Sequence, residues 1–341
     1  MKKILIIGAG AMGSAFSLPC IENNNNVSIV GTHLEKKFIK NLKKNYYHKT
    51  LKSYLPRKVK ILDYQNLIDE LRNRPDYVVI AVSSKGIDWV CKELIKNYDK
   101  KLSLILLTKG LVNYNNKMVT ISEKINKLFQ KNGLPKQDIT SIKGPCLAAG
   151  LINKIRTSTV IANRNIVSAK KVERVITTKY YKAETSKDII GIEVLSAIKN
   201  LYAMVIGASL GLSGPNIQRN IRNKYYHNTS SSLFRESLLE MKNFTVKMHG
   251  LQETTYGLAG LGDLYVSVAG GRNSKMGYYL GLGKKYQNIK RKEMKSITTE
   301  GCELALEIGP IIKKKFKRTQ FPILFALIDA ICKNQKLKIK W

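Results

Sequence analysis

The chain has 341 residues, more than a single hydrophobic core usually supports, which predicts two domains. Apolar residues make up 44% of the chain, an ordinary value for a globular protein that excludes a disordered or fibrous one. The formal net charge of +35 suggests anionic partners, but basic residues spread along the whole chain favour compositional drift as its main cause.

The first half of the chain predicts strands that alternate with helices. Lys3–Ile7 is a short apolar run that ends in glycines, which indicates a buried strand rather than a signal peptide. Ala11–Glu22 and Asn26–Val30 follow as a helix and a second strand. Two further apolar runs with polar borders, Asp76–Val82 and Leu102–Leu107, indicate further strands. This alternation predicts an α/β fold with a doubly wound parallel sheet.

The second half has a different pattern, which predicts a mostly α-helical C-terminal domain. Ile192–Leu212 has helical length and is apolar almost all round, as a helix inside a domain would be. Ser230–Gly250 and Thr299–Phe316 also predict helices. Ser213–His227 is polar and basic, has a Gly-Pro pair near its start, and predicts a loop. The expected domains are 1–188, for a dinucleotide, and 189–341, for a substrate.

The turn after the first strand carries the sequence GAGAMG, which matches the GxGxxG motif and opens the first helix. Gly8 permits a tight turn, Gly10 lets a pyrophosphate approach the backbone, and Gly13 allows the helix to pack against the strand. The helix N-terminus then offers free N–H groups to the phosphates. The motif predicts a Rossmann-type domain whose dinucleotide contacts Gly8, Gly10, Ala11, Met12 and Gly13.

The end of the second strand bears on the choice between NAD and NADP. An acidic residue at this point would bind the hydroxyls of the adenosine ribose. Here the strand is followed by Thr32 and His33, with Lys36 and Lys37 beyond them, and Glu35 lies past the tip. Since these polar and basic side chains suit a 2′-phosphate, the sequence slightly favours NADP, with His33 as a contact.

Several blocks in a fixed order give the chain a specific family resemblance. They are GAGAMG at 8–13, TKG at 108–110, GP at 144–145, GIEVLSAIKN at 191–200, GLAGLGDL at 257–264, GGRN at 270–273, TEG at 299–301 and FPI at 321–323. Over nearly its whole length the chain resembles the NAD(P)-dependent glycerol-3-phosphate dehydrogenases. The resemblance implies an oxidoreductase that interconverts sn-glycerol 3-phosphate and dihydroxyacetone phosphate, supplies glycerol 3-phosphate for phospholipid synthesis, and forms a homodimer.

Three residues have catalytic roles by this resemblance. Lys199 lies in a long apolar helix, where a lysine is costly to bury unless it is paired or its pKa is lowered, and the family uses this lysine as acid and base. Lys109 follows the Leu102–Leu107 strand, at the edge where open α/β sheets place ligands, and resembles the lysine that polarises the reacting oxygen. Asp263 resembles the aspartate that holds the catalytic lysine and the substrate.

The resemblance also assigns the binding residues. Arg272 and Asn273 resemble the clamp for the substrate phosphate, and a guanidinium suits phosphate because it forms two parallel hydrogen bonds. The full substrate set implied is Lys109, Gly144, Cys146, Lys199, Asp263, Ser267, Arg272 and Asn273. Besides the glycine turn and His33, the cofactor set implied is Lys109, Ala148, Arg272 and Glu300.

The chain departs from the family pattern mostly around substrate and cofactor. Cys146 stands where a small hydroxylated residue is usual, and the acidic residue expected next is replaced within Ala148–Gly150. Ala81–Ser84 lacks a proline, Met12 replaces an aromatic residue, and Ser267 replaces a threonine while keeping the hydroxyl. These departures leave open a dehydrogenase of the same fold that acts on a different phosphorylated ketone or polyol.

The basic segment 213–227 is longer than the link expected there. It contains Arg219, Arg222, Lys224 and His227 and no acidic residue. One hypothesis is a mobile basic lid over the anionic substrate, and the alternative is a solvated insertion. A further alternative for the whole chain is a basic nucleic-acid or membrane binding module; the joint presence of Lys109, Lys199 and Asp263 argues against it, so no nucleic acid is expected.

Cysteine and histidine usage gives no sign of a metal site. The five cysteines are far apart, form no CxxC pair and are odd in number, which fits a reducing compartment and a cytoplasmic location. The four histidines are scattered as well, so no zinc site is expected. An uninterrupted stretch of about 20 apolar residues is lacking, so no transmembrane helix is expected.

Overall fold

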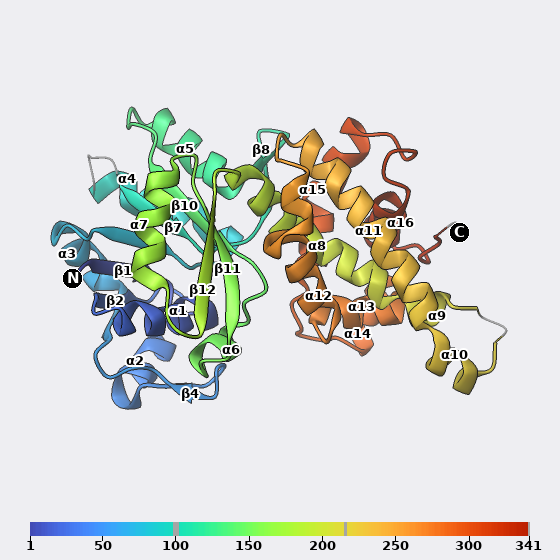
Figure 1. Cartoon of the computed structure of the whole chain (residues 1–341), viewed down its shortest axis with the longest axis horizontal. Helices are drawn as coiled ribbons and strands as arrows, with labels where there is room; N and C mark the ends of the chain where they lie inside the picture. The colour runs from blue at the N-terminus through green and yellow to red at the C-terminus, as the bar shows by residue number, and fades with distance from the viewer. Residues whose placement is uncertain (98–101, 215–216, 340–341) are drawn as a thin grey trace. The chain divides into compact units, whose positions relative to one another are not determined.

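The structure, a computed structural model, describes residues 1–97, 102–214 and 217–339. It divides into two compact units (Figure 1). The first contains Met1–Lys109 and Ile121–Ile189, and the second contains Gly110–Thr120 and the residues from Ile190 onward. The sequence assigned everything before residue 189 to the first domain, so the segment 110–120 departs from that assignment.

The first unit is built on an eight-stranded sheet in the part of the chain that the structure describes. Its strands are β1 (Lys3–Ile7), β2 (Asn26–Val30), β5 (Lys60–Leu62), β6 (Tyr77–Ile80), β7 (Ser103–Leu106), β10 (Asp138–Lys143), β11 (Thr157–Ala162) and β12 (Tyr181–Ser186). Along the sheet they follow the order β12-β11-β10-β7-β6-β1-β2-β5. Six strands are parallel and follow the Rossmann order, namely β10, β7, β6, β1, β2 and β5. Strand β11 runs antiparallel to β10.

Helices cover both faces of this sheet, as a doubly wound fold requires. They are α1 (Ala11–Glu22), α2 (Lys36–Asn45), α3 (Leu67–Arg72), α4 (Ile87–Asn97), α5 (Ile121–Lys131), α6 (Ala148–Ile152) and α7 (Ile166–Ile176). Helix α1 contacts α6 and α7, whereas α4 contacts α3 and α5. A small antiparallel pair, β3 (Tyr47–His48) and β4 (Ser53–Tyr54), lies outside the sheet. The predicted α/β fold is confirmed.

A β-hairpin that interrupts the first unit along the chain belongs to the second unit. Strands β8 (Leu111–Tyr114) and β9 (Lys117–Thr120) pair with each other, and β8 contacts a C-terminal helix. Leu111 and Met118 are buried in the hydrophobic core of the second unit. The assignment of residues 110–120 to the first domain was therefore wrong, because the apolar side chains of a short hairpin reveal no partner in the sequence.

The second unit is almost entirely helical (Figure 1). Its helices are α8 (Ile189–Gly207), α9 (Ser209–Leu212), α10 (Arg219–Tyr225), α11 (His227–Lys247), α12 (Asp263–Val268), α13 (Arg272–Gly281), α14 (Tyr286–Lys292), α15 (Glu300–Lys315) and α16 (Pro322–Cys332). Among the described helices, α8 alone has the length and hydropathy to cross a membrane. Its most apolar window is 94% buried inside the structure, so it serves as the core helix of this unit.

Glycines and a buried carboxylate determine how the helices pack around α8. A Cβ on Gly277 of α13 would lie 1.8 Å from the Met204 carbonyl oxygen of α8, so only glycine permits this approach. Glu240 of α11 accepts hydrogen bonds from the N–H groups of Ile323 and Leu324 in the first turn of α16. A side chain from another helix thus caps α16, whose N-terminal N–H groups have no partner within the helix.

The loop predicted for residues 213–227 is wrong over Arg219–Tyr225. These residues form α10, which has no buried residue, and His227 begins α11. Residues 215 and 216 of the segment lie outside the described part of the chain. A Gly-Pro pair and many polar residues suggested a loop, but polar residues also suit a short exposed helix. The lid hypothesis stays a prediction.

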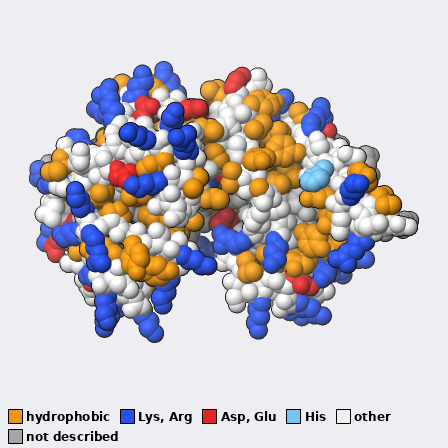
Figure 2. All heavy atoms as spheres, turned by 60° about the horizontal axis from the view of Figure 1, so that its bottom comes forward, with side chains coloured by type: hydrophobic (Ala, Val, Ile, Leu, Met, Phe, Trp, Pro, Cys, Tyr) orange, Lys and Arg blue, Asp and Glu red, His pale blue; other side chains and the backbone are white. Residues whose placement is uncertain are grey.

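Basic side chains are spread over one face of the molecule rather than gathered in one patch (Figure 2). Figure 2 shows Lys and Arg side chains spread over the visible face of both units, among few acidic ones. On this face, the distribution fits compositional drift better than a single basic docking surface.

Candidate functional site

The glycine turn after β1 has the geometry that a dinucleotide requires. Gly8 has a φ of +107°, and a Cβ there would lie 2.9 Å from the Ala81 carbonyl oxygen, so only glycine fits without strain. A Cβ on Gly13 would lie 2.4 Å from the Gly8 carbonyl oxygen. Both glycines therefore serve close packing of β1, α1 and the end of β6.

Gly10 differs from these two glycines, because a Cβ on it would meet nothing within 4 Å. It is the N-cap residue of α1 and, as a glycine, offers no side-chain acceptor to the first N–H groups of that helix. The open space beside Gly10 and the N–H groups that begin α1, at Ala11 and Met12, fit the pyrophosphate of a dinucleotide. These residues would hold the cofactor through backbone contacts, as the motif predicted.

Two side chains that the sequence did not single out fix this turn. His48 is buried, receives a hydrogen bond on Nδ1 from the Leu51 N–H, and therefore donates from Nε2 to the Ala9 carbonyl, 3.2 Å away. Burial lowers the pKa of His48, so the imidazole is neutral around pH 7. The Ser14 hydroxyl donates to the same Ala9 oxygen at 3.0 Å.

Residues of the GP block belong to the same unit as the glycine turn. Gly144 has a φ of +140°, and the Cys146 N–H donates to its carbonyl oxygen. Helix α6, which begins at Ala148, packs against α1. Cys146 and Ala148, both partly buried, contact the same core cluster as Ala11 and Met12. These predicted residues thus pack on the same core, and α6 brings Ala148 to α1.

The lysine of the TKG block follows β7 at the carboxyl edge of the sheet. Lys109 is partly exposed, and its neighbour Thr108 donates to the Val82 carbonyl at 2.7 Å, which joins the ends of β6 and β7. Another lysine lies close by: Lys143, at the end of β10, is 2% exposed and donates to the Leu106 carbonyl. The sequence did not single out Lys143, since one lysine among many carries no pattern.

The predicted catalytic pair of the second unit is in direct contact. The Lys199 Nζ lies 2.5 Å from Asp263 Oδ1 and donates to Ser267 Oγ at 2.6 Å. Lys199 and Asp263 are 5% and 3% exposed, and the Ser267 hydroxyl donates to the Asp263 carbonyl. A buried ammonium is tolerated here because a carboxylate and a hydroxyl oxygen both receive its hydrogens.

The GLAGLGDL block explains how Asp263 reaches Lys199. Leu258–Gly262 forms a π-helical turn that leads directly into α12, with Asp263 as its first residue. A Cβ on Gly260 would lie 2.1 Å from the Thr255 carbonyl oxygen, so the turn can close only with glycine there. Single π-turns often occur at functional sites. Four residues on, one helical turn further, Ser267 lies on the same side as Asp263.

Arg272 and Asn273 begin α13 but differ in their surroundings. Arg272 is 56% exposed and forms an ion pair with Glu300 at 2.9 Å. Asn273 is buried: its Nδ2 donates to Asn200 Oδ1, and its Oδ1 accepts from the Gly301 N–H, each at 3.0 Å. Asn273 thereby ties the residue after Lys199 to the start of α15, which positions Arg272 and Glu300 beside each other.

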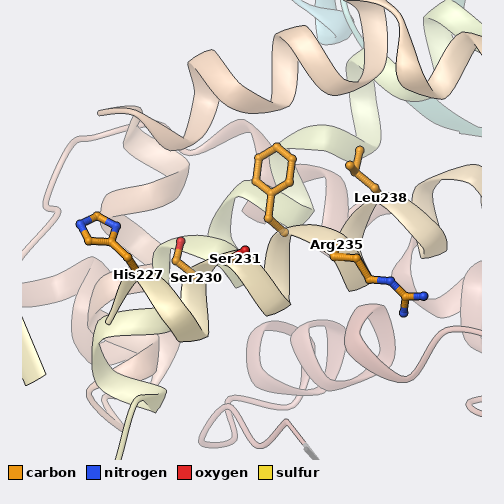
Figure 3. Close-up of a pocket in the computed structure, with 6 residues that line it drawn as sticks. His227, Ser230, Ser231, Arg235 and Leu238 are labelled. Carbon is orange, nitrogen blue, oxygen red and sulfur yellow. The ribbon is translucent and has the colours of Figure 1, made fainter. Parts of the chain in front are cut away.

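A hollow of about 400 Å³ lies elsewhere in the second unit (Figure 3). Its described lining residues all belong to α11 and are His227, Ser230, Ser231, Phe234, Arg235 and Leu238. It contains no predicted site residue. Within the described ranges, no group of three or more His, Cys, Asp or Glu residues could hold a metal ion.

Comparison with known protein families covers both units. Residues 3–169 match the N-terminal domain of NAD-dependent glycerol-3-phosphate dehydrogenase, and residues 188–340 match its C-terminal domain. The NADP(+)-dependent glycerol-3-phosphate dehydrogenase of Archaeoglobus fulgidus is 31% identical over 280 residues, 82% of this chain and 80% of that protein. The chain belongs to the NAD-dependent glycerol-3-phosphate dehydrogenase family. It is therefore an NAD(P)-dependent oxidoreductase, and the resemblance seen in the sequence is confirmed.

Further members of the glycerol-3-phosphate dehydrogenase family agree in sequence and fold. The enzyme of Francisella tularensis subsp. novicida is 30% identical over 331 residues, 95% of this chain and 91% of that one. The glycerol-3-phosphate dehydrogenase structure of Plasmodium falciparum superposes with a TM-score of 0.82 at 21% identity, covering 98% of this chain and 92% of that one. The Coxiella burnetii structure has a TM-score of 0.79 at 22% identity and covers 98% and 96%.

The predicted residues of this glycerol-3-phosphate dehydrogenase family member thus form separate sets in its two units. In the first, the glycine turn leads into α1, α6 with Ala148 packs against α1, and His33 and Lys109 follow β2 and β7. In the second, Lys199, Asp263 and Ser267 are in contact, and Arg272 pairs with Glu300. The roles assigned to individual residues remain predictions.

Proposed function

We propose that this protein interconverts sn-glycerol 3-phosphate and dihydroxyacetone phosphate with NAD(H) or NADP(H). The buried contact of Lys199 with Asp263 and Ser267 carries this proposal. A buried, paired lysine is a suitable acid and base for a reaction that moves a proton on or off a secondary hydroxyl.

The chain's own residues would handle the proton while the bound nicotinamide carries the hydride. For ketone reduction, the Lys199 ammonium donates a proton to the oxygen as the carbon gains the hydride. For alcohol oxidation, the neutral amine takes the hydroxyl proton back. Asp263 and Ser267 orient the Lys199 Nζ through their oxygens. Lys109, at the carboxyl edge of the sheet, is proposed to polarise the same oxygen.

Arg272 and Asn273 are the proposed phosphate ligands. The Arg272 side chain is about half exposed at the first turn of α13. Its guanidinium has five N–H donors, and only its Nη2 bonds to Glu300. The Asn273 amide nitrogen has a second N–H besides the one bonded to Asn200. The N-terminus of α13 adds a favourable dipole for an anion. We also propose that Gly144 and Cys146 contact the substrate.

Backbone and side-chain contacts together would hold the dinucleotide. The proposed ligands are the glycine turn with Ala11 and Met12, His33, Lys109, Ala148, Arg272 and Glu300. We further propose a homodimer in the cytoplasm that supplies glycerol 3-phosphate for phospholipid synthesis. The cysteines are odd in number and three of the five are buried, which suits a reducing compartment.

The test is oxidation of NADH or NADPH by the purified protein with dihydroxyacetone phosphate, followed by loss of nicotinamide absorbance. Turnover with a KM in the range of about 1 μM–1 mM supports the proposal. A panel of other phosphorylated ketones is the control for the departures at Cys146 and Ala148. Faster turnover of a different phosphorylated ketone would overturn the substrate while leaving the reaction type intact.

A further inference from the structure

A carboxylate that the sequence left aside lies over the dinucleotide turn. Glu35 follows β2 and directly precedes α2, and it is partly buried. Its Oε2 accepts a hydrogen bond from the Thr32 N–H at 2.7 Å and another from the Ala9 N–H at 3.3 Å. The side chain therefore bridges the end of the second strand and the middle of the glycine turn.

This carboxylate has no role in its own helix. Glu35 is the N-cap residue of α2, yet its side chain makes no capping bond to that helix. It folds back over the first turn instead, held by two backbone donors. Lys36 and Lys37, the neighbouring cations, are exposed. A fixed negative charge thus lies at the carboxyl edge of the sheet, between the ends of β1 and β2.

The position of Glu35 bears on the choice between the two dinucleotides. In doubly wound folds the adenosine ribose lies beside the first turn, and an acidic residue about 20 residues further on accepts its hydroxyl hydrogens. Glu35 lies at about that distance from the GAGAMG turn. A 2′-phosphate in the same place would bring about two negative charges against this carboxylate. Hydroxyl groups would be favoured there, and a phosphate would be repelled.

A group of aromatic rings beside the same edge points to an adenosine independently. The rings of His33 and Tyr64 lie 5.1 Å and 5.8 Å from the ring of Trp89. His33 follows β2, Tyr64 follows β5, and Trp89 lies in the first turn of α4 after β6. Partly exposed aromatic faces suit a flat base, and adenine is common to both dinucleotides.

We propose that Glu35 reads the adenosine ribose and makes the protein prefer NAD(H) to NADP(H). This deepens the proposed function, on whose use of a nicotinamide dinucleotide it rests. It also reverses the preference for NADP drawn from the sequence, which considered only the residues at the tip of β2. No acidic residue stands at the end of β2 in the sequence, but the Glu35 side chain folds back and places its carboxylate there.

The test measures the Kd of NADH and of NADPH by fluorescence titration without substrate. We expect wild type to bind NADH at least about tenfold more tightly than NADPH. Glu35→Gln keeps the shape and removes the charge, so this ratio should fall about tenfold, mainly through tighter NADPH binding. Glu35→Arg should bind NADPH more tightly than NADH. The control is Glu70→Gln, which removes one charge from an ion pair with Lys60 elsewhere in the first unit.

Three results would overturn the inference. The first is a wild-type Kd for NADPH as low as that for NADH, and the second is a ratio of the two Kd values in Glu35→Gln equal to that of wild type. The third is an equal weakening of NADH and NADPH binding in the Glu35 variants, which would indicate that Glu35 only supports the turn. The titration contains no substrate, so it tests Glu35 separately from the proposed reaction. Preferential NADH binding by a protein that does not turn over dihydroxyacetone phosphate would refute the proposed substrate and still support the role of Glu35.

Discussion

Replacing Lys199 by methionine separates the catalytic from the structural role of the buried pair. The Lys199 and Asp263 side chains are only 7% and 4% exposed. Lys199→Met keeps the length of the side chain and leaves the Asp263 carboxylate buried without its cation. Removing one partner of a buried ion pair costs about 3–5 kcal/mol. At about 2–4 °C per kcal/mol, the melting temperature should fall by about 6–20 °C.

The activity of the same variant should fall further than its stability explains. A lost acid and base group costs roughly 10²–10⁴-fold in kcat. The assay is NADH or NADPH oxidation with dihydroxyacetone phosphate, at a temperature well below the melting transition of the variant. Cofactor binding, measured by titration, should survive, because the glycine turn belongs to the other unit.

The double variant Lys199→Met with Asp263→Asn is the matched control. It removes both charges, so its melting temperature should recover toward that of wild type, while kcat stays low. Thermal unfolding followed by circular dichroism measures the first quantity. A kcat of Lys199→Met within about tenfold of wild type would remove Lys199 from the mechanism. A double variant as unstable as the two single losses added together would refute the pairing.

Three further predictions rest on other residues. Arg272→Ala should raise the KM for the phosphorylated ketone strongly and that for unphosphorylated dihydroxyacetone little; equal losses would show that Arg272 does not read the phosphate. Gly10→Ala should leave the melting temperature within about 2 °C of wild type and weaken dinucleotide binding, because its Cβ would point into open space. The Gly13→Ala variant should be destabilised by about 1–3 kcal/mol, and equal stability of the two would contradict the packing argument. Burial raises the pKa of Glu240 from 4.5 to about 7. The folded state therefore holds this proton more tightly than the unfolded chain, and about 3 kcal/mol of stability is lost as pH rises from about 4.5 through about 7. Unfolding of Glu240→Gln across this range should lack that loss, and parallel pH profiles would refute it.

Local patterns predicted some elements to the residue. The strands Lys3–Ile7 and Asn26–Val30 and the helix Ala11–Glu22 have the predicted bounds, because glycines and polar turns border each apolar run. The core helix begins at Ile189, three residues before its predicted start, and ends at Gly207. The helix over Arg219–Tyr225 was missed because its residues have no apolar face against a core.

Some features of the candidate site could likewise be predicted from the sequence, and others could not. The GxGxxG turn could be predicted from spacing alone, since Gly8 needs its positive φ, Gly13 allows close packing, and Gly10 leaves space for a ligand. The contact between Lys199 and Asp263 was implied by family resemblance, although 64 residues separate them. The structural contacts of Asn273 and Glu240 could not be predicted from the sequence, because each depends on backbone groups that other helices bring to it.

The sequence by itself determined the family, the α/β and helical halves, and the residue types that the chemistry needs. These follow from short-range periodicity and from motifs whose members are close along the chain. The tertiary structure alone decided that residues 110–120 pack in the second unit and that Glu35 returns to the glycine turn. Such contacts depend on where the chain folds back and where a side chain points, and neither leaves a periodic trace in the sequence.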